Sequence, residues 1–206
     1  MTELLSGDHL EALQESFNIG IGRAAADLAD LLGQEIGLGI PKVRCIDVDQ
    51  GERFVLEVLY DSVVFVRQEF HGSFDGAAVL IFRDTIGMTL AQLLLDELGL
   101  LHQMDDVQED AVVEVGNVIL NGVISGLSEL LNAPLGTTLP RFRRMSAEGI
   151  EMQRLAAPDS VVILVDAELG VADQALGGVL ALQFDPASFN EFKRRSVQAF
   201  GFGEHE

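Results

Sequence analysis

The sequence predicts an α+β fold in which one structural unit occurs twice, and three observations predict it. Long segments repeat apolar residues at three- and four-residue steps, as amphipathic helices do. Short apolar runs follow, separated by only a few turn-forming residues, and such short connections favour antiparallel neighbours. The whole pattern restarts about 99 residues later, which is typical of an internally duplicated chain.

The first helix is expected over about residues 8–33. Its apolar residues fall on one face and are Leu10, Leu13, Phe17, Ile21, Ala24, Leu28, Leu31 and Leu32. Asp8 and Glu11 have the spacing of a capping box, in which each side chain accepts a backbone N–H of the first turn. Gly33 and Pro41 predict the end of the helix, because glycine tolerates the left-handed cap and proline cannot continue the helical hydrogen bonds.

Strands are expected next over residues 42–48, 54–60, 63–70 and 77–82, and a helix over 85–99 closes the first half. In the second half, a strand over 178–184 corresponds to 76–82, and a final helix is expected over about 186–200. Identical residues match at one offset: Glu15 with Glu114, Asn18 with Asn117, Leu28 with Leu127, Leu31 with Leu130, Leu32 with Leu131 and Pro41 with Pro140.

The two copies span about residues 8–100 and 106–202, and no linker rich in Pro, Ser or Gly separates them. Each copy is near the lower size limit of a domain. We therefore expect residues 1–206 to form a single domain whose halves share a sheet and a core, rather than two independent units. The order of the strands stays open at this point.

Composition argues against several function classes. The chain has 33 acidic and 13 basic residues, so its net charge of −20 repels nucleic acid and anionic lipid, and neither is expected as a partner. Cys45 is the only cysteine, which leaves no disulfide within the chain and no CxxC metal or redox pair. The reducing cytoplasm suits such a chain, and no apolar run approaches the roughly 20 residues of a membrane span.

Two glutamate–asparagine pairs are the candidate functional residues. The pairs are Glu15 with Asn18 and Glu114 with Asn117. In each pair a carboxylate and an amide lie three residues apart, so both project from one helix face, and neither is a favourable core residue. Asp110 extends the second pair by one turn, and Glu11 takes the corresponding place in the first copy.

These motifs resemble those of the CheC/CheX/FliY family of chemotaxis phosphatases, and CheC most closely. The matching segments are Glu15-Ser-Phe-Asn18-Ile-Gly-Ile-Gly and Asp110-Ala-Val-Val-Glu114-Val-Gly-Asn117. The resemblance covers essentially the whole chain and implies a pseudo-twofold fold, with two long paired helices outside the antiparallel sheet or sheets. Glu11 departs from the family pattern, which has Asp or Ser at that position, and a capping box also explains it.

Members of that family hydrolyse the aspartyl-phosphate of the response regulator CheY. By resemblance, Glu15 and Glu114 would pair with a lysine of the regulator, while Asn18 and Asn117 would orient the attacking water. An amide suits this task because it accepts a hydrogen bond from water and donates one to a phosphoryl oxygen without adding negative charge. The regulator would supply Mg²⁺, so no cofactor or metal of the chain's own is expected.

A second hypothesis is a non-catalytic adaptor that binds a response regulator, CheD or the flagellar switch without turnover. The resemblance also implies CheD as a partner of the enzyme. Gly20, Gly22 and Ala25 match a dinucleotide-binding pattern, but they lie inside a predicted helix rather than after a strand. A close approach by a partner or by a neighbouring helix explains these glycines equally well.

Overall fold

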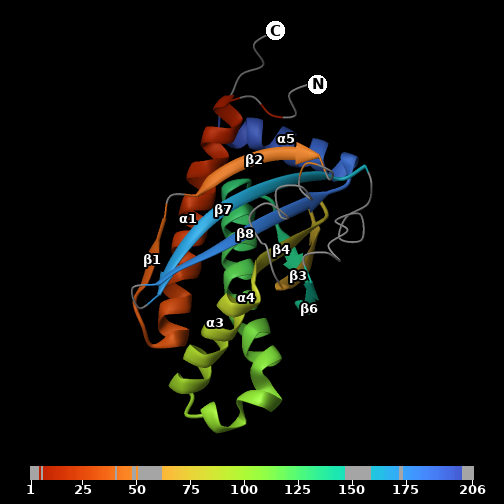
Figure 1. Ribbon diagram of the computed structural model, residues 1–206. Coiled ribbons are helices and arrows are strands. Elements are labelled where there is room, and N and C mark those ends of the chain that lie inside the picture. Colours follow the sequence, from red (N-terminus) through yellow and green to blue (C-terminus); the bar gives the residue numbers. More distant parts are fainter. Residues whose placement is uncertain are drawn as a thin grey trace.

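The computed structural model describes residues 5, 7–39, 41–47, 50, 62–146, 159–171 and 174–200 (Figure 1). Its helices are α1 (Gly7–Leu32), α3 (Asp84–Glu97), α4 (Met104–Leu130) and α5 (Pro186–Phe200), with a short 3₁₀ helix, η1 (Leu101–Gln103), before α4. Its strands are β1 (Ile36–Leu38), β2 (Lys42–Asp47), β3 (Ser62–Gly72), β4 (Gly76–Arg83), β5 (Leu135–Thr137), β6 (Arg141–Ser146), β7 (Val161–Val171) and β8 (Gln174–Phe184). The strand expected over 54–60 and the end of the one over 42–48 lie outside the described residues.

One antiparallel sheet of eight strands runs through both halves of the chain, in the order β1-β7-β8-β4-β3-β5. The second strand of each half crosses to the other half, because β2 pairs with β7 and β6 pairs with β3. The two crossings have equivalent registers: Lys42 lies opposite Asp166, and Arg141 lies opposite Arg67. The sheet therefore has pseudo-twofold symmetry, and the predicted α+β fold with an antiparallel sheet is confirmed.

The pseudo-twofold axis passes through the middle of the sheet. There β4 pairs with β8, and the equivalent leucines Leu80 and Leu180 lie opposite each other. The segments after α1 and α4 differ from the sequence-based expectation of a simple helix end, because 36–38 and 135–137 form β1 and β5. Strands of three residues are too short for alternation of apolar and polar side chains to show.

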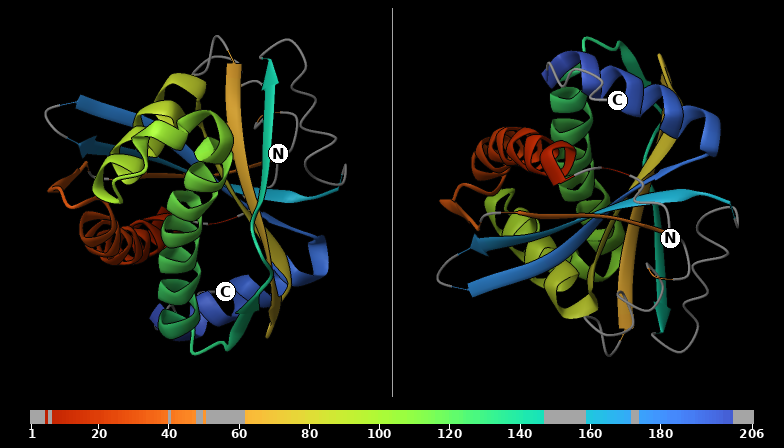
Figure 2. Two further views of the ribbon diagram at one scale, coloured as in Figure 1. Left: turned by 90° about the horizontal axis from the view of Figure 1, so that it is seen from below. Right: turned by 90° about the horizontal axis from the view of Figure 1, so that it is seen from above.

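The helices α1, α3 and α4 pack together on one face of the sheet (Figure 2). That face carries the larger core cluster, to which the helices contribute buried residues such as Phe17, Leu28 and Leu120. Alternate residues of the central strands point the other way and form a second, smaller cluster that includes Phe65 and Leu164. The long helices are thus outside the sheet and paired, as the resemblance implied.

The helices α1 and α4 cross at small residues. A Cβ atom added at Gly126 would lie 3.0 Å from Cα of Gly20, and one added at Gly122 would lie 2.6 Å from Cβ of Ala24. These pairings also show that the two helices run antiparallel. The close approach of a neighbouring helix accounts for Gly20, and the motif that begins there is helical rather than a nucleotide-binding loop.

Cys45 lies on β2 and packs against the core as a partly buried residue. Burial raises the pKa of its thiol to about 12. A thiol at neutral pH is then almost entirely protonated, and it is a weak nucleophile and a weak metal ligand. Cys45 is therefore a packing residue, as expected from its strand.

Asp185 begins α5. Its carboxylate accepts hydrogen bonds from the backbone N–H groups of Ala187 and Ser188, at 2.8 and 2.9 Å, and Pro186 occupies the first helical position. The Ser188 N–H and hydroxyl, together with the Ala187 N–H, hold the pKa of Asp185 below its usual range. The helix so started places Phe189 and Phe192 against Phe184 in an aromatic cluster of the core.

Replacing Asp185 with alanine is expected to lower the free energy of unfolding by roughly 1 kcal/mol, because two backbone donors lose their acceptor. A carboxyl whose pKa is depressed by folding stabilises the fold above its unfolded pKa, near 3.9, and this contribution is lost as the pH falls through the folded pKa. Urea denaturation between pH 3 and pH 7 measures both effects, and the difference between parent and variant should narrow at the acid end. Asp185→Asn is the matched control and should retain most of the stability at pH 7, so an equal loss in both variants would contradict capping.

Candidate functional site

The four motif side chains lie on the outer sides of the two crossing helices. Glu15 and Asn18 on α1 are exposed, Glu114 on α4 is exposed, and Asn117 on α4 is half-buried. Since the helices are antiparallel and cross near Gly20, the two asparagines lie on opposite sides of the crossing. At about 1.5 Å per residue they are roughly 16 Å apart along the helix axes. The structure thus forms two separate sites.

The carboxylates of the two motifs are not engaged within the protein. Of the described ion pairs, none involves Glu11, Glu15, Asp110 or Glu114, and all four side chains are exposed. Exposed carboxylates elsewhere do have cationic partners, such as Glu129 with Arg23 across the helix pair. The motif carboxylates are therefore available to a cation on another molecule.

Glu11 and Asp110 each lie one helical turn before the glutamate of their copy, as the spacing predicted. The capping box of Glu11 with Asp8 stays a prediction, because the side chain of Asp8 lies outside the described residues. Ile19, directly after Asn18, is 48% exposed, which is unusual for a large apolar residue in this helix. The first site thus combines an amide, two carboxylates and an apolar side chain on one surface.

The second site contains a chain of side-chain amides that sequence analysis missed. The Nδ2 of Asn121 donates to Oδ1 of Asn117 at 2.8 Å, and Nε2 of Gln68 on β3 donates to Oδ1 of Asn121 at 3.0 Å. The same Nε2 donates to the backbone carbonyl of Thr138 at 2.9 Å. Asn121 follows Asn117 by one helical turn, and this spacing was a usable signal. Gln68 carried none, because its strand is 53 residues away in sequence.

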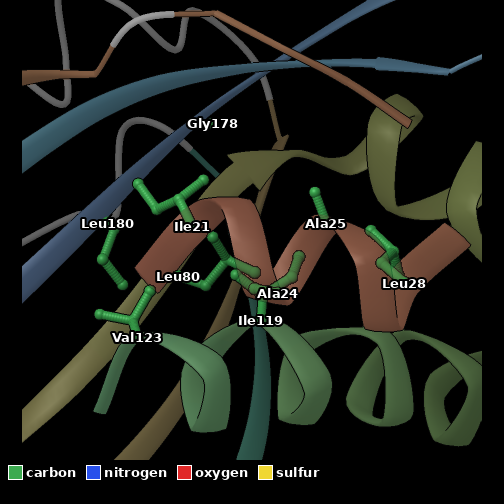
Figure 3. A pocket seen from close by; sticks show the side chains of 9 residues that line it. All are labelled: Ile21, Ala24, Ala25, Leu28, Leu80, Ile119, Val123, Gly178 and Leu180. Carbon is green, nitrogen blue, oxygen red and sulfur yellow. The ribbon is translucent and has the colours of Figure 1, made fainter. Parts of the chain in front are cut away.

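A small cavity lies between the helix pair and the central strands (Figure 3). Its volume is about 30 Å³, and its walls are Ile21, Ala24, Ala25, Leu28, Leu80, Ile119, Val123, Gly178 and Leu180. The cavity sits beside the pseudo-twofold axis, where small residues meet. Its walls offer no polar group that could orient a substrate, so it is a packing defect rather than a reaction site.

Filling this cavity is expected to stabilise the protein. A Cβ at Gly178 would meet only ordinary contacts, the nearest being the Ile81 carbonyl oxygen at 3.6 Å. Gly178→Ala should raise the free energy of unfolding by about 1 kcal/mol, through lower entropy of the unfolded chain and a smaller void. Gly177→Ala is the matched control, since that residue has no atom near its added Cβ. Thermal melting of both variants provides the measurement, and a Gly178→Ala protein less stable than the control would contradict the expectation.

The stretch Val107–Leu130 in α4 is long and apolar enough to cross a membrane by length and composition. Within the fold, however, 61% of its most apolar window is buried. Core helices of soluble proteins pass the same test, so the stretch is weak evidence of a span. Among the described residues, no three His, Cys, Asp or Glu side chains come together in a group that could hold a metal ion.

Comparison with known proteins places this fold. The chain is 24% identical over 178 residues to a Halobacterium salinarum protein named "Putative CheY-P phosphatase CheC1", covering 84% of this chain and 88% of that protein. The crystal structure of Thermotoga maritima FliY matches with a TM-score of 0.77 at 19% identity, over 97% of this chain and all of that one. No family model matches the sequence.

Two further structures share the fold. The FliM middle domain of H. pylori matches with a TM-score of 0.66 at 13% identity, over 93% of this chain and 99% of that one. A Borrelia burgdorferi CheX, solved with CheY, BeF₃ and Mg²⁺, matches with a TM-score of 0.50 at 18% identity, over 82% of this chain and 98% of that one. Fold and motifs thus define the class, and the resemblance to the CheC/CheX/FliY family is confirmed.

Proposed function

We propose that the protein hydrolyses the aspartyl-phosphate of a CheY-type response regulator. The observation that carries the proposal is the pair of accessible Glu-x-x-Asn motifs on two antiparallel helices, with both glutamates free of ion pairs. The name of the Halobacterium relative supports the activity, and the complex that contains CheX and CheY supports the choice of partner. We expect the protein to act in the cytoplasm, where phosphorylated regulators occur.

The chemistry needs little from this chain. An acyl phosphate is a reactive bond, and transfer of its phosphoryl group depends mainly on positioning and charge neutralisation. Asn18 or Asn117 would hold a water in line with the phosphorus and donate a hydrogen bond to a phosphoryl oxygen. The regulator would supply Mg²⁺ to neutralise the phosphoryl charge. Water attacks the phosphorus, the bond to the aspartyl oxygen breaks, and inorganic phosphate and a free carboxylate are released.

The glutamates would dock the regulator. Glu15 and Glu114 would pair with a lysine beside the phosphorylated aspartate, and Glu11 and Asp110 would add negative charge one turn away. Ile19 offers apolar contact area at the first site. The regulator would approach each helix from its outer side, so the two sites would be used separately.

The decisive measurement is the decay of phosphorylated regulator with and without the protein. Candidate CheY-type regulators are phosphorylated with acetyl phosphate and Mg²⁺, the donor is removed, and release of inorganic phosphate is followed. Faster decay of at least one regulator is expected. Unchanged decay for every regulator of the host would overturn the proposed activity.

Replacing Glu114 with lysine in the Asn18→Ala background is expected to weaken association with the regulator about tenfold, because like charges would then face each other. The apparent KM should rise while kcat changes little. Glu109→Lys in the same background changes the net charge equally at an exposed position of α4 on a different side of the helix. Steady-state kinetics of both variants measure the effect, and an equal rise in KM would indicate general electrostatics instead of docking.

The second candidate is an adaptor that binds without turnover. It is favoured by the likeness to switch proteins, including a FliG–FliM complex from H. pylori whose matched chain has a TM-score of 0.65. Binding of regulator, CheD or a switch component, together with unchanged phosphate release, would identify the adaptor. CheD stays a prediction to which no surface is assigned.

A further inference from the structure

The chain of amides at the second site has a fixed direction. It starts at the backbone carbonyl of Thr138, which can only accept, so the atom of Gln68 that faces it must be the donor Nε2. The second hydrogen of Nε2 then requires an acceptor, Oδ1 of Asn121. The other end of the Asn121 amide is therefore Nδ2, which donates to Oδ1 of Asn117.

This direction decides what Asn117 presents. Its Oδ1 faces Asn121, so its Nδ2 points away from the chain, with both hydrogens uncommitted among the described residues. One lone pair of Oδ1 is left for a water. A side chain held in this way has both groups that hydrolysis requires, a donor for a phosphoryl oxygen and an acceptor for the attacking water, before the regulator arrives.

The first copy cannot build this chain. The 99-residue offset that relates the strand registers places Gly22 at the position of Asn121 and Ala167 at that of Gln68. Neither residue has a side-chain hydrogen-bonding group. Asn18 is exposed, and no hydrogen bond to its side chain occurs within the described part of the chain. The two copies thus share Glu and Asn but differ in what holds the Asn.

Stability does not explain the chain. Gln68 is 2% exposed, and its Oε1 has no hydrogen-bond partner. A buried amide with an unsatisfied oxygen is unfavourable compared with an apolar residue of similar size, and its neighbours Val66 and Phe70 on the same face of β3 are apolar. A role for Gln68 in orienting other groups explains its presence.

We propose that Gln68 and Asn121 are positioning residues that orient the Asn117 amide, and that they make the second copy the faster of the two sites. This inference rests on the proposed phosphatase activity for its rate consequence. It does not rest on that activity for the ordering of the side chain, which can be measured separately.

The kinetic test uses proteins with one working site. In the Asn18→Ala background, Asn121→Asp is expected to lower kcat about tenfold with little change in KM. The aspartate is nearly isosteric and still accepts from Gln68, but it cannot donate to Asn117, so it would turn the Asn117 amide around. In the Asn117→Ala background the same substitution should have no effect. Thermal melting of each variant reports the fold.

Full kcat of Asn121→Asp in the Asn18→Ala background would overturn the positioning role while leaving the phosphatase intact. Gln68→Leu offers a second variant, expected to lower kcat severalfold without loss of thermal stability. A loss of stability that accompanies every loss of rate would mark both residues as structural only.

A readout without the regulator separates this inference from the function. Side-chain amide order parameters from NMR are expected to be high for Asn117 and low for Asn18, and Asn121→Asp should shift the Asn117 resonance. Equal mobility of the two amides would overturn the inference whether or not any regulator is dephosphorylated. Inactivity on all regulators with an ordered Asn117 would instead refute only the proposed function.

Discussion

Replacing both Asn18 and Asn117 with alanine is expected to return the decay of the phosphorylated regulator to its spontaneous rate. Removal of a preorganised hydrogen-bond donor at a reacting oxygen typically costs about 10²- to 10³-fold in rate. Because Asn18 is exposed and Asn117 half-buried, the fold should survive both substitutions. Phosphate release at saturating protein is the measurement.

Asn190→Ala is the matched control, because Asn190 is an exposed asparagine on α5, far from both motifs in the sequence. It should leave the rate unchanged. Of the single variants, Asn117→Ala should lose more activity than Asn18→Ala if the second site is the faster one. A double variant with parental activity would show that these amides do not orient the water.

Introducing valine at Gly126 is expected to lower the free energy of unfolding by about 1–3 kcal/mol. Even a Cβ there would lie 3.0 Å from Cα of Gly20, and that backbone atom can retreat only if the helices α1 and α4 separate. Both motifs lie on these two helices, so activity should fall as well. Chemical denaturation gives the stability change.

Ser125→Val provides the comparison for that substitution. Ser125 is the preceding residue of α4 and is exposed, so valine there alters helix propensity without touching α1. Its effect should stay within about 0.5 kcal/mol. Equal stability of the two variants would mean that the crossing tolerates larger residues than its geometry suggests.

Most of the fold could be predicted from the sequence because long helices have a strong apolar period. The expected helix over 8–33 is observed as α1 (Gly7–Leu32), and the final helix has the expected bounds, Pro186–Phe200. The expected strands over 63–70 and 77–82 each lie within an observed strand. Alternation and periodicity extend over enough residues there to identify each element.

The pairing of the strands could not be predicted in the same way. Nothing local to β2 specifies that it should add to β7 from the other half, because the choice depends on the packing of the complete sheet. The chain from Gln68 to Asn117 has the same origin. It connects β3 to α4, and only the assembled fold brings those side chains within hydrogen-bond distance. Sequence analysis found the amides but not what holds one of them.

The crossing of strands between halves bears on how such a chain could have arisen. A polypeptide with one copy alone would expose the edge that β2 or β6 now covers, and it would have no partner for β4. Two identical copies could satisfy each other by exchanging those strands around a true twofold axis. The present molecule therefore has the architecture of a strand-swapped homodimer joined into one polypeptide, in which each half has become free to diverge while the other preserves the shared scaffold.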